Sequence, residues 1–196
     1  MSVVLVDAGG TNIGSVRYAL QRLGADAALT SDAAAIRTAD KVVLPGVGAA
    51  GPGMARLREL GLVEVLRSLR QPVLGVCLGM QLLCAHSEEN DTECLGLIDA
   101  PVRCFADTPG LRVPHMGWND VSVQREHPLL AGLGEGEQAY FVHSYAVPVG
   151  EWTLATADYG GAFSAVIAHG NFHGMQFHPE RSAAVGAKLL KNFLDL

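Results

Sequence analysis

The chain has 196 residues, of which 49% are hydrophobic and 17% are charged, and its formal net charge is −6. This length and composition predict a single domain over residues 1–196 with a full hydrophobic core, and they exclude a disordered chain. The negative charge argues against nucleic acid or an anionic membrane surface as the main partner. Because no hydrophobic run is long enough to span a membrane and no basic leader precedes the first strand, we expect a cytoplasmic protein.

The first half of the sequence alternates short hydrophobic strands with segments of helical periodicity. Strands are predicted at 2–6, 27–29, 42–44 and 73–76, and helices at 13–23, 33–37, 54–60, 62–69 and from 78 onward. This alternation predicts a mostly parallel sheet with helices on both faces. In such sheets the active site lies at the carboxyl ends of the strands, which is where Asp7, Pro45 and Cys77 fall.

The second half changes character. From about residue 100 to residue 174 it contains short β-like runs separated by turn signals, for example at 121–123, 139–143, 153–157 and 165–168. No linker-like stretch precedes this region, so we expect an antiparallel extension of the same sheet rather than a second domain. A last helix is predicted at 183–194.

The four cysteines cluster in the middle of the chain, at positions 77, 84, 94 and 104. They lack the spacing of small secreted proteins and therefore predict reduced thiols rather than a disulfide framework. They also form no C-x-x-C pair, so we expect no zinc site, and we expect no other metal and no cofactor.

One cysteine stands at the junction of a buried strand and a helix. Cys77 follows the hydrophobic run 73–76, and Gly75 and Gly79 lie two residues to either side of it. This Gly-x-nucleophile-x-Gly spacing is typical of the sharp turn that exposes a nucleophile at the top of an α/β sheet. The turn places the sulfur at a helix N-terminus, which favours a thiolate. The alternative is a buried structural cysteine, because lone cysteines on hydrophobic strands are commonly inert.

The segment Gln-Phe-His-Pro-Glu at 176–180 supplies candidate partners for that cysteine. Pro179 forces His178 out of the helical region, and residues two apart on an extended segment point to the same side. The Glu180 carboxylate can therefore orient the His178 imidazole, as the carboxylate of a catalytic triad does. No other histidine combines an enforced extended backbone with a carboxylate two residues away. A solvated surface His and Glu is the alternative interpretation.

A glycine-rich turn, Pro-Gly-Val-Gly at 45–48, directly follows the third predicted strand. Its glycines allow backbone amides to point inward, as an oxyanion site requires. Taken alone, an ordinary glycine-rich turn is the better interpretation of this segment.

Together these motifs resemble the class I, triad-type glutamine amidotransferases. Gly-Val-Cys-Leu-Gly-Met-Gln at 75–81 and the segment 176–180 look like the two signatures of that family, and the resemblance covers essentially the whole chain. The segments 45–48, 114–119 and 142–145 look most like the glutaminase subunits of histidine biosynthesis. The resemblance implies a flavodoxin-like α/β fold, a Cys77-His178-Glu180 triad, glutamine as the substrate and no cofactor.

The resemblance also implies which residues surround the substrate. Backbone amides of Leu78 and of the 47–48 turn would stabilise the oxyanion, and the remaining residues would hold the glutamine. The implied oxyanion and substrate-binding residues are Val47, Gly48, Leu78, Gln81, Glu89, Ser144 and Tyr145. Glu89 is equally consistent with a solvated helix end.

Ammonia released into water is largely protonated and is then no nucleophile, so such a glutaminase is useful only when it is docked on a synthase. The resemblance implies that this partner is a (β/α)8-barrel cyclase subunit, bound in a heterodimer. The candidate interface residues are Asn12, Pro114, His115, Met116, Trp118 and Arg181. A Met and a Trp close together on an aromatic-poor surface fit an anchored contact, although a Trp118 buried in the core is the alternative.

The chain departs from the family pattern in two places. The family usually has Asp-Tyr-Gly-x-Gly-Asn after the first strand, where residues 7–12 here are Asp-Ala-Gly-Gly-Thr-Asn. Arg181 stands where a lysine is common, and the two cations pair differently with a carboxylate.

The alternative functions are a glutaminase for guanylate, anthranilate or pyridoxal phosphate synthesis, a catalytically silent regulatory scaffold, and a peptidase or γ-glutamyl hydrolase. The segment 114–119 argues against the first, and an intact triad argues against the second.

Overall fold

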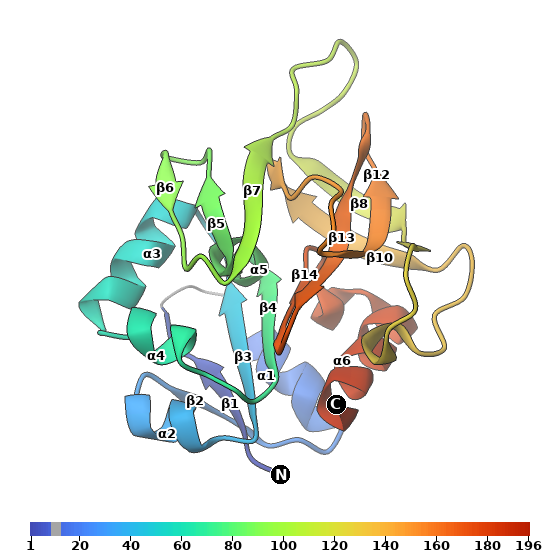
Figure 1. The fold of residues 1–196 in the computed structure, drawn as a ribbon. Helices are drawn as coiled ribbons and strands as arrows, with labels where there is room; N and C mark the ends of the chain where they lie inside the picture. The colour runs from blue at the N-terminus through green and yellow to red at the C-terminus, as the bar shows by residue number, and fades with distance from the viewer. Residues whose placement is uncertain (9–12) are drawn as a thin grey trace.

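A computed structural model of the protein describes residues 1–8 and 13–196, and its centre is a twisted eight-stranded sheet (Figure 1). The strands of this sheet are β1 (Val3–Val6), β2 (Ala27–Thr30), β3 (Lys41–Gly46), β4 (Val73–Cys77), β9 (Ser122–Val123), β12 (Thr153–Asp158), β13 (Ala162–His169) and β14 (Phe172–Met175). Their order is β2-β1-β3-β4-β14-β13-β12-β9. Pairing is parallel from β2 to β14 and antiparallel from β14 to β9. The mostly parallel sheet with an antiparallel extension is thus confirmed.

Helices cover both faces of the parallel part. They are α1 (Ile13–Arg22), α2 (Ala33–Thr38), α3 (Ala50–Glu59), α4 (Val63–Arg67), α5 (Leu78–Leu83) and α6 (Ala183–Asp195). On β1, Val3 and Leu5 pack with α1 and α6, whereas Val4 and Val6 pack with α2, α3, α4 and α5. Because side chains alternate along a strand, a strand that is buried on both faces is hydrophobic throughout, which explains the unbroken runs in the sequence.

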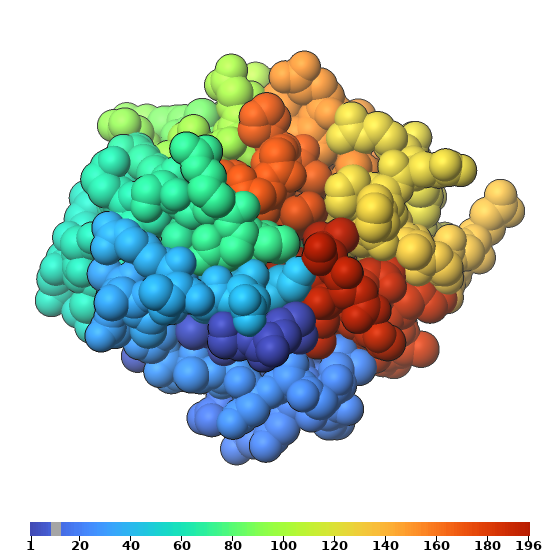
Figure 2. All heavy atoms as spheres, turned by 60° about the horizontal axis from the view of Figure 1, so that its bottom comes forward, coloured from blue at the N-terminus to red at the C-terminus, as the bar shows by residue number. Residues whose placement is uncertain are grey.

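The ends of the chain lie away from the carboxyl ends of β3 and β4. The N-terminus and the end of α6 both lie near the bottom of Figure 1, whereas β3 and β4 point upward. The view from below shows the red α6 beside the blue N-terminal segments (Figure 2). No helix in the described ranges has the length and hydropathy needed to cross a membrane.

Two smaller sheets stand above the carboxyl edge. One pairs β8 (His115–Asp120) with β10 (Gln138–His143), and the other has the order β11-β7-β5-β6, with β5 (Cys84–Ser87), β6 (Thr92–Glu93), β7 (Ile98–Cys104) and β11 (Tyr145–Ala146). The expectation that the run 139–143 extends the main sheet is therefore wrong. This run forms a separate amphipathic hairpin with β8. Its inward side chains, among them Ala139 and Phe141, pack against the core.

The predicted helix at 54–60 begins earlier, at Ala50. No side chain at its N-cap residue accepts from the first turn. Instead, the Glu89 Oε2 atom, distant in sequence, accepts a hydrogen bond from the Ala50 N–H at 2.8 Å. A helix start set by a tertiary contact leaves no local capping signal in the sequence.

Candidate active site

Cys77 lies on a strained turn between β4 and α5. Its backbone has φ 52° and ψ −110°, a conformation that non-glycine residues rarely adopt and that costs about 1–3 kcal/mol. Neighbouring backbone leaves no room for side chains on either side: a Cβ on Gly79 would lie 1.8 Å from the Leu44 carbonyl oxygen, and one on Gly75 would lie 2.6 Å from that of Gly79. The glycines are therefore required by packing, and the predicted sharp turn is present.

His178 is held in an extended conformation before Pro179, with φ −93° and ψ 97°, at the start of the short 3-10 helix η2 (Pro179–Arg181). Its backbone N–H donates to the Tyr140 carbonyl at 2.9 Å, and its carbonyl accepts from the Ser182 hydroxyl at 2.7 Å. The Ser182 hydroxyl in turn accepts from the Tyr140 N–H at 2.9 Å. These contacts attach the backbone of His178 to β10.

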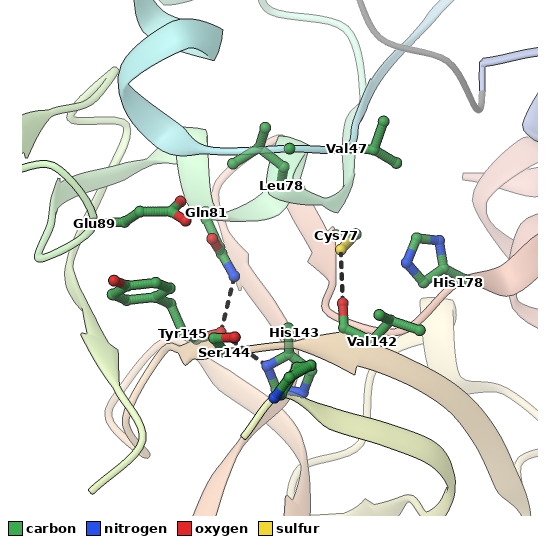
Figure 3. Close-up of a pocket in the computed structure, with 12 residues that line it drawn as sticks. Val47, Cys77, Leu78, Gln81, Glu89, Val142, His143, Ser144, Tyr145 and His178 are labelled. Atoms are coloured by element: carbon green, nitrogen blue, oxygen red, sulfur yellow. Dashed lines mark hydrogen bonds between the residues drawn. The ribbon is translucent and has the colours of Figure 1, made fainter. Parts of the chain in front are cut away.

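The ring of His178 joins the cysteine to the glutamate. Its Nδ1 atom lies 2.9 Å from Glu180 Oε1, and both side chains are buried. Burial lowers the pKa of His178, but hydrogen bonds to Cys77 and Glu180 and the negative charges of those side chains outweigh it and raise this pKa to about 10. Figure 3 shows the imidazole beside Cys77, at one end of a cavity. The three predicted side chains thus come together, and the His178 ring between the cysteine and the carboxylate is an imidazolium at pH 7.

The cavity has a volume of about 320 Å³ and contains Cys77 and His178 in its wall. All seven residues that the sequence predicted to form the oxyanion and substrate sites also line it, together with Pro114, Val142 and His143. Glu89 is not a solvated helix end: one carboxylate oxygen caps α3, and the side chain runs along the cavity wall toward Gln81 (Figure 3).

The turn after β3 runs beside the nucleophile. Gly46 pairs with Cys77 in the parallel register, and the two following residues reach the cavity. Gly48 has φ +100°, which favours glycine at this place. Leu78 is the first residue of α5, so its N–H has no partner within the helix. The backbone segments predicted to form the oxyanion site therefore flank the sulfur.

Gln81 does more than line the cavity. Its Nε2 atom donates to the Tyr145 carbonyl at 2.9 Å and to Gln176 Oε1 at 3.0 Å, so both amide hydrogens are used within the protein. Only its Oε1 atom remains for a substrate. Gln176 is a residue that the sequence analysis missed, although its place in the segment 176–180, two residues before His178, was a signal for it.

The predicted interface residues divide into exposed and buried ones. Met116 and Trp118 are 62% and 51% exposed, so the core alternative for Trp118 is wrong. Trp118 packs edge-on against the Tyr140 ring, and the Arg181 guanidinium lies 4.5 Å from the centre of that ring. Pro114 is exposed beside the cavity. Asn12 lies outside the described residues.

The prediction that His115 belongs to the partner interface is wrong. Only 3% of His115 is exposed, so its side chain cannot form part of a docking surface. Buried and exposed side chains alternate along β8, so His115 points inward while its neighbours are exposed. Its ring stacks on the rings of Tyr159 and Phe141. Its Nδ1 atom lies 3.0 Å from His143 Nε2, and His143 Nδ1 donates to the Tyr145 carbonyl at 2.8 Å. Burial lowers the pKa of His115 to about 4 and that of His143 to about 3, so both rings are neutral at pH 7.

The chain is similar to known proteins over nearly its whole length. Residues 4–196 match the family model described as glutamine amidotransferase class-I. Subunit HisH of imidazole glycerol phosphate synthase from Xanthomonas euvesicatoria pv. vesicatoria is 58% identical over 194 residues, which cover 99% of this chain and 97% of the relative. The protein of the same name from Xylella fastidiosa is 55% identical over the same shares of both chains.

Solved structures share the fold at lower sequence identity. A structure described as a glutamine amidotransferase aligns with a TM-score of 0.77 and 22% identity, covering 100% of this chain and 98% of that one. A structure described as PurLQS from Thermotoga maritima aligns with a TM-score of 0.74 and 18% identity, covering 99% of this chain and 97% of that one. At these identities the likeness concerns the fold alone.

Proposed function

This chain belongs to the class-I glutamine amidotransferase family, and from that premise we propose that it is the glutaminase subunit of an imidazole glycerol phosphate synthase. It hydrolyses L-glutamine to glutamate and passes the ammonia to a synthase partner in histidine biosynthesis. The observation that carries the proposal is the contact of Cys77, His178 and Glu180 at the wall of a cavity suited to a small amino acid.

The first half of the proposed reaction is acylation of the enzyme. The Cys77 thiolate attacks the side-chain amide carbon of glutamine, and the carbonyl oxygen becomes negative. Backbone amides of Leu78 and of the 47–48 turn stabilise that charge, each donor contributing about 3 kcal/mol. The His178 imidazolium then protonates the leaving nitrogen, which departs as ammonia and leaves a thioester on Cys77.

The second half is hydrolysis of the thioester. His178, now neutral, removes a proton from water, and the resulting hydroxide attacks the thioester carbon at the same oxyanion site. Glutamate leaves and the thiolate–imidazolium pair returns. Throughout, the Glu180 carboxylate keeps the ring oriented through its contact with Nδ1, so that Nε2 is the atom that exchanges protons.

The partner that we propose is a (β/α)8-barrel cyclase subunit, docked as a heterodimer on the outer face of the β8–β10 hairpin. That face carries Met116, Trp118 and the Tyr140–Arg181 stack, and it borders the cavity at Pro114 and Val142. Exposed aromatic, Met and Arg side chains are typical of interface anchors. A partner seated there would receive ammonia without its release to water. We retain Asn12 as a further candidate contact and a cytoplasmic location as part of the proposal.

The test separates the glutaminase from the synthase. In a complex with the cyclase subunit, Cys77→Ala should abolish synthesis from glutamine and leave synthesis from ammonium salts intact, because ammonia bypasses the nucleophile. Cys94→Ala, which removes a buried thiol that does not line the cavity, serves as the matched control and should leave both activities unchanged. Loss of both activities in Cys77→Ala would contradict the proposed division of labour.

A further inference from the structure

A second glutamine lies against the nucleophile, at the end of the neighbouring strand β14. Gln176 follows β14, and because Met175 pairs with Val76 in the parallel register, Gln176 stands beside Cys77. Its side chain is completely buried, and its Nε2 atom lies 3.8 Å from Cys77 Sγ, within hydrogen-bond distance for a sulfur acceptor. The mechanism described above gives this amide no part.

The orientation of the Gln176 amide follows from its neighbours. The Tyr145 carbonyl can only accept, so the Gln81 group facing it at 2.9 Å is the donating NH2. The same NH2 faces Gln176 at 3.0 Å, so the Gln176 atom there must be the accepting oxygen. The other end of the Gln176 amide, the one facing the sulfur, is therefore NH2. A flipped Gln176 would bring two donors together and turn its oxygen toward the sulfur.

This donor matters because the sulfur also faces an acceptor. The Val142 carbonyl oxygen lies 3.9 Å from Cys77 Sγ and can only receive a proton from a thiol (Figure 3). A carbonyl favours the thiol and a donating N–H favours the thiolate, because a hydrogen bond to the charged form stabilises that form. Gln176 thus opposes Val142 and acts together with His178.

We propose that Gln176 is a further catalytic residue of the glutaminase reaction proposed above, donating a hydrogen bond that stabilises the Cys77 thiolate, and that Gln81 is the positioning residue that fixes the direction of this donor. The inference rests on the proposed function for its role in turnover, but its physical content concerns the sulfur alone. The other titratable groups near the sulfur are His178 beside it, Glu180 on the other side of the His178 ring, and His143, Tyr145 and Glu89 across the cavity.

The experiment follows alkylation of Cys77 without any substrate. The intact chain is treated with iodoacetamide across a pH series, and the Cys77 and Cys104 peptides are quantified separately by mass spectrometry. The pH of half-maximal alkylation at Cys77 reports the coupled Cys77–His178 pair. The exposed Cys104 is an internal control in every sample.

Removal of the donor should move this midpoint upward. We expect Gln176→Met to raise it by about one to two pH units, and Gln176→Glu, which keeps the shape but adds a negative charge, to raise it further. Gln81→Met should raise it less, because Gln176 keeps its N–H groups and loses only their orientation. Gln71→Met is the matched control: this glutamine binds the Ile36 carbonyl at the other end of β4, and its loss should leave the midpoint unchanged.

Circular dichroism establishes which variants are folded. If Gln176→Met is not folded, the near-isosteric Gln176→Glu decides the test. An unchanged Cys77 midpoint in a folded Gln176 variant, or an equal shift in Gln71→Met, would overturn the inference. The two proposals can also fail separately. If the midpoint shifts in the Gln176 variants but the wild-type chain hydrolyses no glutamine in complex with the cyclase subunit, the hydrogen bond from Gln176 to the thiolate is supported and the proposed function is refuted.

Discussion

The Cys77 turn and the β8–β10 hairpin meet at one cavity but are built in opposite ways. The turn is buried, its shape is imposed by neighbouring backbone that would lie within 3 Å of a Cβ on Gly75 or Gly79, and it carries the nucleophile. The hairpin is two-stranded and amphipathic, with an inner face of rings and an outer face that exposes Met116 and Trp118. The turn therefore contributes the nucleophile from within the chain, whereas we propose that a partner covers the outer face of the hairpin.

The largest expected effect tests the chemistry at the turn. His178→Ala removes the proton donor and acceptor of both half-reactions, so we expect glutaminase turnover of the complex to fall by about 10³-fold or more, with synthesis from ammonium salts retained. Steady-state glutamate production measures this. His86→Ala, at a half-buried histidine paired with Asp91 and outside the cavity wall, is the control. A loss below tenfold would remove His178 from the mechanism.

The next test concerns the shape of the turn. Gly79→Ala places a Cβ against the Leu44 carbonyl, and this steric clash can be relieved only if β3 and α5 move apart. We therefore expect the free energy of unfolding to fall by about 3 kcal/mol or more. Urea denaturation measures it. Gly14→Ala, on an exposed position of α1 with only ordinary contacts, should be neutral or stabilising. Equal effects at both glycines would show that the turn is not specially constrained.

A third test addresses the hairpin. Trp118→Ala removes an exposed ring that packs on Tyr140, so the chain should remain folded while its affinity for the cyclase subunit falls by about 2 kcal/mol, or roughly 30-fold in Kd. Isothermal titration calorimetry measures the affinity. Val149→Ala, which removes an exposed hydrophobic side chain outside β8 and β10, is the matched control. An unchanged Kd for Trp118→Ala would move the interface elsewhere.

The smallest expected effect concerns the inner face of the hairpin. The lowered pKa of about 4 means that folded His115 stays neutral while the unfolded chain takes up a proton below about pH 6.5, so stability is present above that pH and falls as the pH drops toward 4. His115→Phe removes this proton uptake. Relative to the wild type, the variant should gain about 1 kcal/mol in the free energy of unfolding between pH 7 and pH 5.5. Urea denaturation at both values measures it, and a constant difference would refute the buried neutral ring.

The sequence alone predicted the strand–helix alternation, the strained turn at Cys77, and the extended His178 with its carboxylate two residues away. Each depends on neighbours within about five residues: the period of buried side chains, the missing Cβ atoms, the ring of Pro179. Only the tertiary structure decided that the run 139–143 pairs with β8, that His115 points inward, that Glu89 caps α3, and that Gln176 reaches the sulfur. These features are contacts between segments distant in sequence, and whether a polar side chain faces solvent or a buried partner depends on which segments pack beside it.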